Sequence, residues 1–93
     1  MITVHHAIES DFWTAADKFD PKKFRNVAQV NTDDLEEAYK LTNNIDKPWI
    51  ENKEVFPCFL KPQRSTSMGD VLQIGHEYFA VATFGFTKIE KAK

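Results

Sequence analysis

The sequence has few of the residues on which several protein classes depend. Cys58 is the only cysteine, so no disulfide can form within the chain, and we find no ligand set that would complete a zinc site around it. No apolar run approaches the roughly 20 residues that span a bilayer. Residues 1–4 lack the basic start and long apolar core of a signal peptide. We therefore expect a cytoplasmic protein that uses no metal and no cofactor.

Positive charge is also scarce. Twelve Lys and Arg against fourteen Asp and Glu give a formal net charge of −2, whereas a general nucleic-acid binder usually has a basic patch or a high pI. The acids concentrate in residues 32–56, a segment that would attract a basic partner or imitate DNA. A solvated helix face with an acidic first turn is the simpler explanation. Lys22, Lys23 and Arg25 form a small basic cluster, which is a weak footprint for phosphate.

The composition is that of one small folded domain. Ninety-three residues, 42% of them hydrophobic and 13% aromatic, argue against disorder. A chain of this length buries about 60–65% of its unfolded surface, enough for one modest core. We therefore expect a single domain over residues 1–93.

The clearest local pattern is a β-hairpin in the last third of the chain. Residues 70–74 and 77–84 are rich in Val, Leu, Ile, Tyr and Phe, and Gly75-His76 between them suits a two-residue type II′ turn. This register places Ile74 opposite Glu77 and Leu72 opposite Phe79. Alternation then gives a core-facing set and a second set that is apolar enough to be partly covered. The core-facing set is Leu72, Ile74, Phe79 and Val81; the second set is Val71, Gln73, Tyr78, Ala80 and Ala82.

The loop before this hairpin gathers polar side chains: Arg64, Ser65, Thr66, Ser67 and Asp70. An arginine offers a planar fork to phosphate or carboxylate, and hydroxyls and loop amides add donors, so one interpretation is an anion-binding loop. The other interpretation is that the hydroxyls bond nearby backbone in a turn that Asp70 ends. The glycine spacing and the lysine of a P-loop are absent.

The same stretch resembles a known family. Ser65-Thr66-Ser67-Met68-Gly69-Asp70-Val71, followed by a strand pair that closes on Phe84-Gly85-Phe86, is similar to the YodL-like domains found among small phage, prophage and plasmid-borne proteins. Their pattern reads roughly S-L-S-V-S-D-V, a short strand pair, and S-F-G-F. Here Gly69 replaces the second-last Ser, and Thr83 stands before Phe84. The likeness covers residues 64–89, with a looser one back through residues 41–43 and Trp49. It implies a mobile-element setting in a host cell, and no reaction or catalytic residue.

The rest of the chain predicts further elements. Residues 2–8 and 26–30 have the pattern of strands, and residues 10–18 that of a short helix. Asp20 with Pro21 is typical of a capped turn. Residues 33–45 have apolar positions at helical spacing after a cap at Thr32 or Asn31, with Glu36 and Lys40 placed to pair at i,i+4. Residues 55–60 are extended but interrupted by Pro57, which confines them to an edge.

Two adjacent histidines and one tryptophan allow alternative interpretations. His5-His6 suggests a metal site, but neighbouring strand residues point to opposite faces, so the pair cannot easily hold one ion. Trp49, in a loop beside acidic residues, is either an interface anchor or a lid on the core. Gly85, inside an apolar run, predicts a β-bulge.

These patterns favour an α+β fold. We predict an antiparallel sheet of residues 2–8, 26–30 and the 70–84 hairpin, with helix 33–45 on its apolar face. The alternative is a small SH3- or PUA-like barrel with an added helix, in which Gly69 and Gly85 form the corners.

The sequence favours binding over catalysis. The chain contains the residue types of a catalytic site: Ser65 or Ser67 with a histidine, or the acid pair Asp70 and Glu77. No spacing in the sequence brings them together, so we expect no enzyme. We expect a non-catalytic accessory protein of a phage or mobile element that binds a host or phage macromolecule, most simply a protein. The alternatives are an anion- or nucleotide-binding module using Arg64–Ser67, and a weak nucleic-acid contact through Lys22, Lys23, Arg25 and Arg64. The tentative binding residues are Arg64, Ser65, Thr66, Ser67, Asp70 and Trp49.

Overall fold

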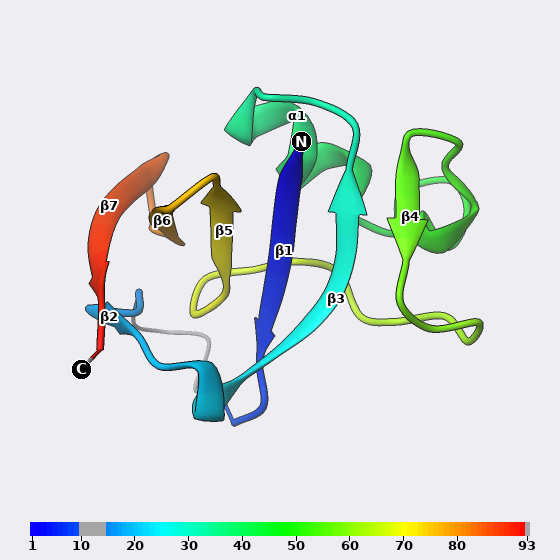
Figure 1. Cartoon of the computed structure of the whole chain (residues 1–93). Helices are drawn as coiled ribbons and strands as arrows, with labels where there is room; N and C mark the ends of the chain where they lie inside the picture. The colour runs from blue at the N-terminus through cyan, green and yellow to red at the C-terminus, as the bar shows by residue number, and fades with distance from the viewer. Residues whose placement is uncertain (10–14, 93) are drawn as a thin grey trace.

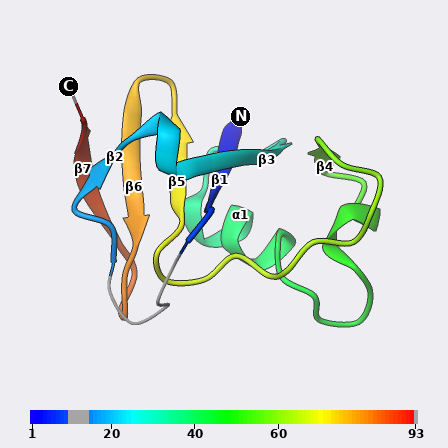
Figure 2. The ribbon, with the colours of Figure 1, turned by 90° about the horizontal axis from the view of Figure 1, so that it is seen from below.

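The described part of the protein is built around one seven-stranded sheet with one α-helix against one face (Figures 1 and 2). The computed structural model describes residues 1–9 and 15–92. From edge to edge the strand order is β2-β7-β6-β5-β1-β3-β4. The strands are β1 (Ile2–Ala7), β2 (Lys18–Phe19), β3 (Phe24–Val30), β4 (Val55–Pro57), β5 (Val71–Ile74), β6 (Glu77–Val81) and β7 (Phe86–Lys91). The helices are α1 (Leu35–Leu41) and the 3₁₀ turns η1 (Pro21–Lys23) and η2 (Trp49–Glu51). The α+β prediction is confirmed, in a larger sheet than expected.

The predicted hairpin forms in the predicted register. β5 and β6 pair with Leu72 opposite Phe79 and Ile74 opposite Glu77. Gly75 has φ +57° at the turn, a conformation that glycine adopts without steric cost. Both faces of the hairpin are covered: Leu72 packs in the cluster under α1, and Val71 packs in a second cluster on the other side.

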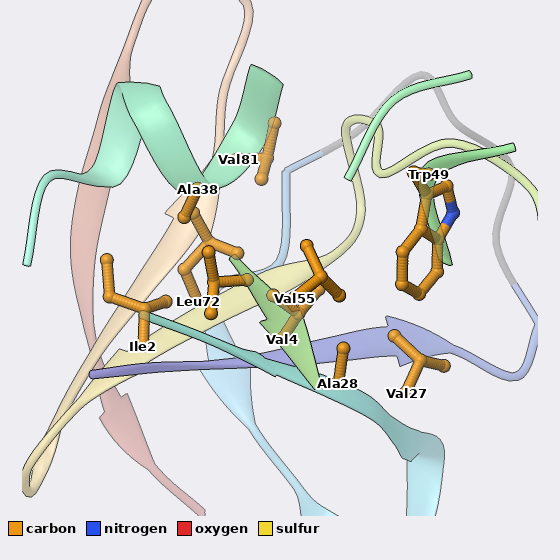
Figure 3. Packing of buried hydrophobic residues seen from close by; sticks show 10 residues of the cluster. Ile2, Val4, Val27, Ala28, Ala38, Trp49, Val55, Leu72 and Val81 are labelled. Carbon is orange, nitrogen blue, oxygen red and sulfur yellow. The ribbon is translucent and has the colours of Figure 1, made fainter. Parts of the chain in front are cut away.

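β1 lies between β3 and β5 in the sheet and runs antiparallel to both. Its face toward α1 carries Ile2 and Val4, which pack with Leu72, Val55 and other buried side chains (Figure 3). The register against β3 shifts between Val4 and His5. His5 contacts the second cluster and His6 the first, so the two histidines lie on opposite faces, as alternation predicts.

Helix α1 is shorter than the 33–45 predicted. It begins after Asp34, whose carboxylate accepts the backbone N–H of Glu36 at 2.9 Å and of Glu37 at 3.4 Å, whereas Thr32 accepts only the N–H of Asp34. It ends at Thr42, whose hydroxyl donates to the carbonyl of Ala38. Residues beyond Thr42 leave the helix.

The segment around Gly85 is a second hairpin and not a bulge in one long strand. β6 ends at Val81, and the N–H of Ala82 donates to the carbonyl of Gly85 at 3.1 Å across the turn that leads into β7. Gly85 has φ +79°, so it provides the positive φ that turns the chain. The prediction failed because the apolar residues after Val81 were counted with the strand, although Phe84 is 94% exposed at the turn.

The helix predicted for residues 10–18 is not supported where it can be assessed. Residues 10–14 lie outside the described residues, 15–17 are not helical, and Lys18–Phe19 form β2, which runs parallel to β7. The sheet is therefore mixed, whereas the sequence predicted an antiparallel one. The capped turn after it is confirmed, because the Asp20 carboxylate accepts the N–H of Lys22 in η1.

The sheet curls without closing into a barrel. The ring of Phe19 in β2 lies 4.6 Å from that of His5 in β1 and 4.5 Å from that of Tyr78 in β6, although β1 is four places away in the strand order. β2 and β4 nevertheless remain the two edges, and no pairing between them occurs in the described chain.

The β4 edge is closed to a further strand. The N–H of Cys58 donates to the carbonyl of Val27, and the N–H of Asn31 donates to the carbonyl of Glu54, so these residues of the segment face β3. Backbone groups alternate along a strand, so those of Val55 and Pro57 face away from the sheet. Pro57 has no N–H, and the N–H of Val55 is bonded to the carbonyl of Asn52. An edge without a donor resists strand addition.

No helix in the part of the chain that the structure describes is long and apolar enough to cross a membrane.

Candidate functional site

The polar loop that the sequence singled out is fixed to the sheet by one buried carboxylate. Asp70 lies at the start of β5 and is completely buried. Its Oδ1 accepts the N–H of Ala7 at 2.8 Å, and its Oδ2 accepts the N–H of Ser67 at 2.9 Å. Each oxygen also accepts from the guanidinium of Arg64 at 2.7 Å. Four donors compensate the cost of burying this charge.

Arg64 directs its fork inward. Nη1 donates to Asp70 and to the carbonyl of Ser65, and Nη2 donates to Asp70 and to the carbonyl of Ala7. Each terminal nitrogen has two N–H groups, so all four are engaged within the protein. This geometry favours the structural interpretation of the loop over the anion-binding one, because an incoming phosphate would have to displace the Asp70 carboxylate.

A second chain of hydrogen bonds runs from β1 to the end of α1 through Thr66. Thr42 Oγ1 donates to the carbonyl of Ala38, so it accepts from Thr66 Oγ1 at 2.8 Å. Since the Thr66 proton is used in that bond, His6 Nε2, 2.9 Å away, must be the donor to Thr66 Oγ1. Neutral His6 therefore carries its proton on Nε2. We call His6, Thr42, Arg64, Thr66 and Asp70 the polar cluster.

Burial sets the charge state of His6. Desolvation is the largest cause and lowers the pKa of His6 from 6.5 to about 4. The Asp70 carboxylate, 3.9 Å from Nε2, raises the pKa, and the Arg64 guanidinium lowers it. His6 is therefore neutral at pH 7. Burial also lowers the pKa of His5, against a hydrogen bond to Gln73 that raises it.

Acid is expected to destabilise the protein as the pH falls from about 6.5 toward about 4. In the unfolded chain His6 takes up a proton near 6.5, but in the folded chain only near 4, so the unfolded state gains protons first. The contribution is complete above pH 6.5. Between pH 6.5 and pH 5 the free energy of unfolding should fall by about 2 kcal/mol. Urea unfolding at both pH values measures this fall.

His6→Gln separates this effect from general acid sensitivity. Glutamine keeps an N–H donor for Thr66 and does not titrate. The variant should lose most of the pH dependence, with a remainder from His5, whereas Thr87→Ala, an exposed change on β7, should leave it unchanged. An equally steep fall in His6→Gln would contradict the assignment.

Trp49 and Ser65, two further predicted binding residues, also make contacts that hold the loop in place. Trp49 is completely buried, and its Nε1 donates to the carbonyl of Arg64 at 2.8 Å. Figure 3 shows its ring against the sheet beside Val27, so of the two interpretations of Trp49 the structure supports the one that places it in the core. Ser65 Oγ accepts the N–H of Asn44, which ties the loop to the segment after α1.

Neither Ser65 nor Ser67 pairs with a histidine among the described residues. Among the described residues His6 is the histidine that contacts a hydroxyl of the loop, and its partner is Thr66, not Ser65 or Ser67. Thr66 donates its own proton to Thr42 and is buried, so His6 does not act on it as a base. No group of three or more metal-binding side chains occurs in the described chain.

The four basic residues of the predicted nucleic-acid contact lie in two separate places. Arg25 and Arg64 line one small hollow of about 180 Å³ with His6. The guanidinium of Arg25 stacks over the Phe59 ring, 5.6 Å from its centroid. Lys22 and Lys23 lie in η1, a separate element.

Sequence reasoning missed His6 and Thr42 as members of the polar cluster. Thr42 stood at the end of an apolar helical stripe, and His6 alternated with apolar strand residues toward the core. A polar residue on a core-facing position requires a partner, and that rule would have pointed to both. It does not name the partner, since the contacts His6–Thr66 and Thr66–Thr42 join residues 60 and 24 positions apart in the sequence.

Large apolar side chains are displayed on the surface. Leu60 is 99% exposed in the loop after β4, Phe84 is 94% exposed in the β6–β7 turn, and Ile45 is 70% exposed after α1. Ile8 and Phe56 are also exposed. Ile45 was predicted to extend the core stripe of the helix and does not, because the helix ends four residues earlier.

No family model matches the chain, and neither curated proteins nor solved structures give a match. The likeness of residues 64–89 to the YodL-like domains therefore stays a prediction.

Proposed function

We propose that this protein is a non-catalytic accessory protein of a phage or another mobile element, and that it acts by binding a host or phage macromolecule, most simply a protein. The mobile-element setting rests on the resemblance of residues 64–89. Genes for virion, integration or plasmid-transfer proteins on both sides of its own gene would support that setting. A neighbourhood of host housekeeping genes would contradict it.

The observation that carries the binding proposal is the contrast between the polar cluster and the surface. The charged, imidazole and hydroxyl groups of the polar cluster, which catalysis or anion binding would use, are hydrogen-bonded to one another. Leu60 and Phe84, by contrast, are almost fully exposed although both are large and apolar. Large apolar side chains at the surface offer a partner the kind of area that anchors protein interfaces.

Capture from bacterial and phage-infected lysates at low salt tests this function. The immobilised full chain should capture a partner protein, and nuclease treatment of the lysate should not reduce this capture. Leu60→Ser or Phe84→Ser should reduce the recovery of that partner about tenfold or more. Thr87→Ala, an exposed change on β7, is the matched control and should capture as much as the wild type.

Two outcomes would overturn the proposal. Recovery that disappears with nuclease would replace it with the nucleic-acid alternative. Equal recovery by the wild type and by the Leu60→Ser, Phe84→Ser double variant would mean that the exposed apolar side chains bind nothing.

A further inference from the structure

We propose that the hollow between α1 and the β6–β7 turn binds a protein segment that carries a lysine or arginine next to a large apolar side chain. The inference rests on the proposed function and assigns the site and chemistry of the partner. We call this hollow, which is lined by Glu36, Tyr39, Val81, Thr83, Gly85 and Phe86, the α1 notch.

The α1 notch has the size and lining of a pocket for one side chain. Its volume is about 170 Å³, and Tyr39 of α1, Val81 of β6 and Phe86 of β7 line it. The rings of Tyr39 and Phe86 meet edge to face with centroids 6.3 Å apart. Pockets for small molecules usually measure about 300–1,000 Å³. A hollow of this size, lined by two aromatic rings, a valine and the Glu36 carboxylate, therefore suits a single side chain of a partner.

Phe84 lies in the β6–β7 turn, between Thr83 and Gly85, which line the notch. The bond from Ala82 N–H to the Gly85 carbonyl and the positive φ of Gly85 fix the backbone on either side of it. An exposed aromatic side chain on an ordered turn loses little conformational entropy when a partner covers it. Phe84 and the hollow together give a partner one pocket to enter and one ring to cover.

Charge decides what kind of partner fits. Glu36 lines the hollow, and Glu37 follows it on α1. Asp33 is paired with the N-terminal ammonium at 2.7 Å, and the Asp34 carboxylate caps the helix. Within the described chain neither Glu36 nor Glu37 forms an ion pair, and the predicted Glu36–Lys40 pair does not form.

Unpaired carboxylates beside an apolar hollow attract a cation on the partner and repel phosphate. A nucleic acid is therefore disfavoured at this site. An added strand is not the mode of binding either, because the notch is formed by side chains of a helix and a turn and not by a free sheet edge.

A random library of roughly 12-residue peptides, selected on the immobilised full chain, tests the assignment. Recovered peptides should be enriched in Lys or Arg beside Leu, Phe or Trp. Phe84→Ser should weaken their binding about tenfold or more, and a Glu36→Lys, Glu37→Lys variant should do the same. High salt should weaken binding, since exposed charge pairs are screened. Ile8→Ser, an exposed apolar site after β1, is the matched control and should bind like the wild type.

The location is checked directly by amide chemical shifts. Adding a selected peptide should move the signals of Tyr39, Thr83 and Gly85 and leave those of Cys58 and Lys61 in place. Peptides enriched in acids, or peptides insensitive to Phe84→Ser, overturn the assignment. A concentration-dependent dimer that Phe84→Ser abolishes also overturns it, because the occupant is then a second copy of this chain.

Failure of this assignment is distinguishable from failure of the proposed function. If lysate capture depends on Leu60 and not on Phe84, the protein binds a partner through the other surface and only the notch is rejected. A library that yields no peptide above background also rejects the notch, while lysate capture by the wild type decides the broader function.

Discussion

Asp70→Ala is expected to lower the free energy of unfolding by about 3 kcal/mol. The substitution leaves the Arg64 guanidinium and the N–H groups of Ala7 and Ser67 without their acceptor. Removing one partner of a buried ion pair costs about 3–5 kcal/mol. Because the Arg64 side chain is 35% exposed and regains some water, we expect the lower end of that range. Urea or guanidinium unfolding measures the change.

Two controls show whether this cost belongs to the buried pair. Glu77→Ala removes the Lys88–Glu77 contact of 3.5 Å, in which both side chains are more than half exposed, and should change stability by less than about 0.5 kcal/mol. In a double-mutant cycle, Arg64→Met with Asp70→Asn should cost about 1–3 kcal/mol less than the sum of the single variants. Additive costs would mean that Arg64 and Asp70 are not coupled.

Trp49→Ala is expected to cost about 3–5 kcal/mol, the usual range for removing a buried indole ring. Trp49 is completely buried and is the largest side chain in the core. Its Nε1 also donates to the carbonyl of Arg64, so the variant leaves that carbonyl without its indole donor and loosens the loop that carries the polar cluster. With a total stability of roughly 5–15 kcal/mol for a domain, this change brings the protein close to unfolding.

Phe84→Ala gives the matched aromatic control. Its ring is exposed at the β6–β7 turn, so its removal should change the free energy of unfolding by less than about 0.5 kcal/mol. Trp49→Phe should lie between the two, at roughly 1–2 kcal/mol, because it keeps a ring and loses the hydrogen bond. Equal effects of Trp49→Ala and Phe84→Ala would contradict the burial of Trp49.

The two effects share one physical cause. The loop of residues 64–70 has no regular hydrogen-bonded ladder of its own, so several of its backbone groups bond side chains instead. Trp49 bonds the carbonyl of Arg64, and Asp70 bonds the N–H of Ser67. No buried side-chain nitrogen or oxygen among the described residues lacks a hydrogen-bond partner. The residues that looked most like a binding site are therefore the ones that hold this loop in place.

The local elements could be predicted where one rule was sufficient. Alternation and the glycine at residue 75 defined the β5–β6 hairpin and its register, because a two-residue turn leaves only one pairing. Alternation likewise placed His5 and His6 on opposite faces. Pro57 marked an edge strand because it cannot donate to a ladder. The end of α1 was misjudged because the apolar spacing continued past Thr42, where the hydroxyl bonds back to Ala38 and the chain turns away.

The role of the polar loop was open in the sequence because either interpretation used the same residue types. Arg64 and Asp70 are six residues apart, and nothing in that spacing shows whether the guanidinium faces solvent or the carboxylate. The curl of the sheet, which brings Phe19 of β2 onto His5 of β1, was equally absent from any local pattern. Both depend on contacts between segments that are distant along the chain.

By itself, the sequence determined which stretches pair or turn locally, since side-chain alternation, glycine and proline act within a few residues. Only the tertiary structure decided that Trp49 is core, that Arg64 is committed to Asp70, and that Phe84 is left on the surface. The physical reason is that burial is a property of the assembled sheet and helix: a charge or a ring becomes part of the interior or of a binding surface according to what the distant parts of the chain place against it.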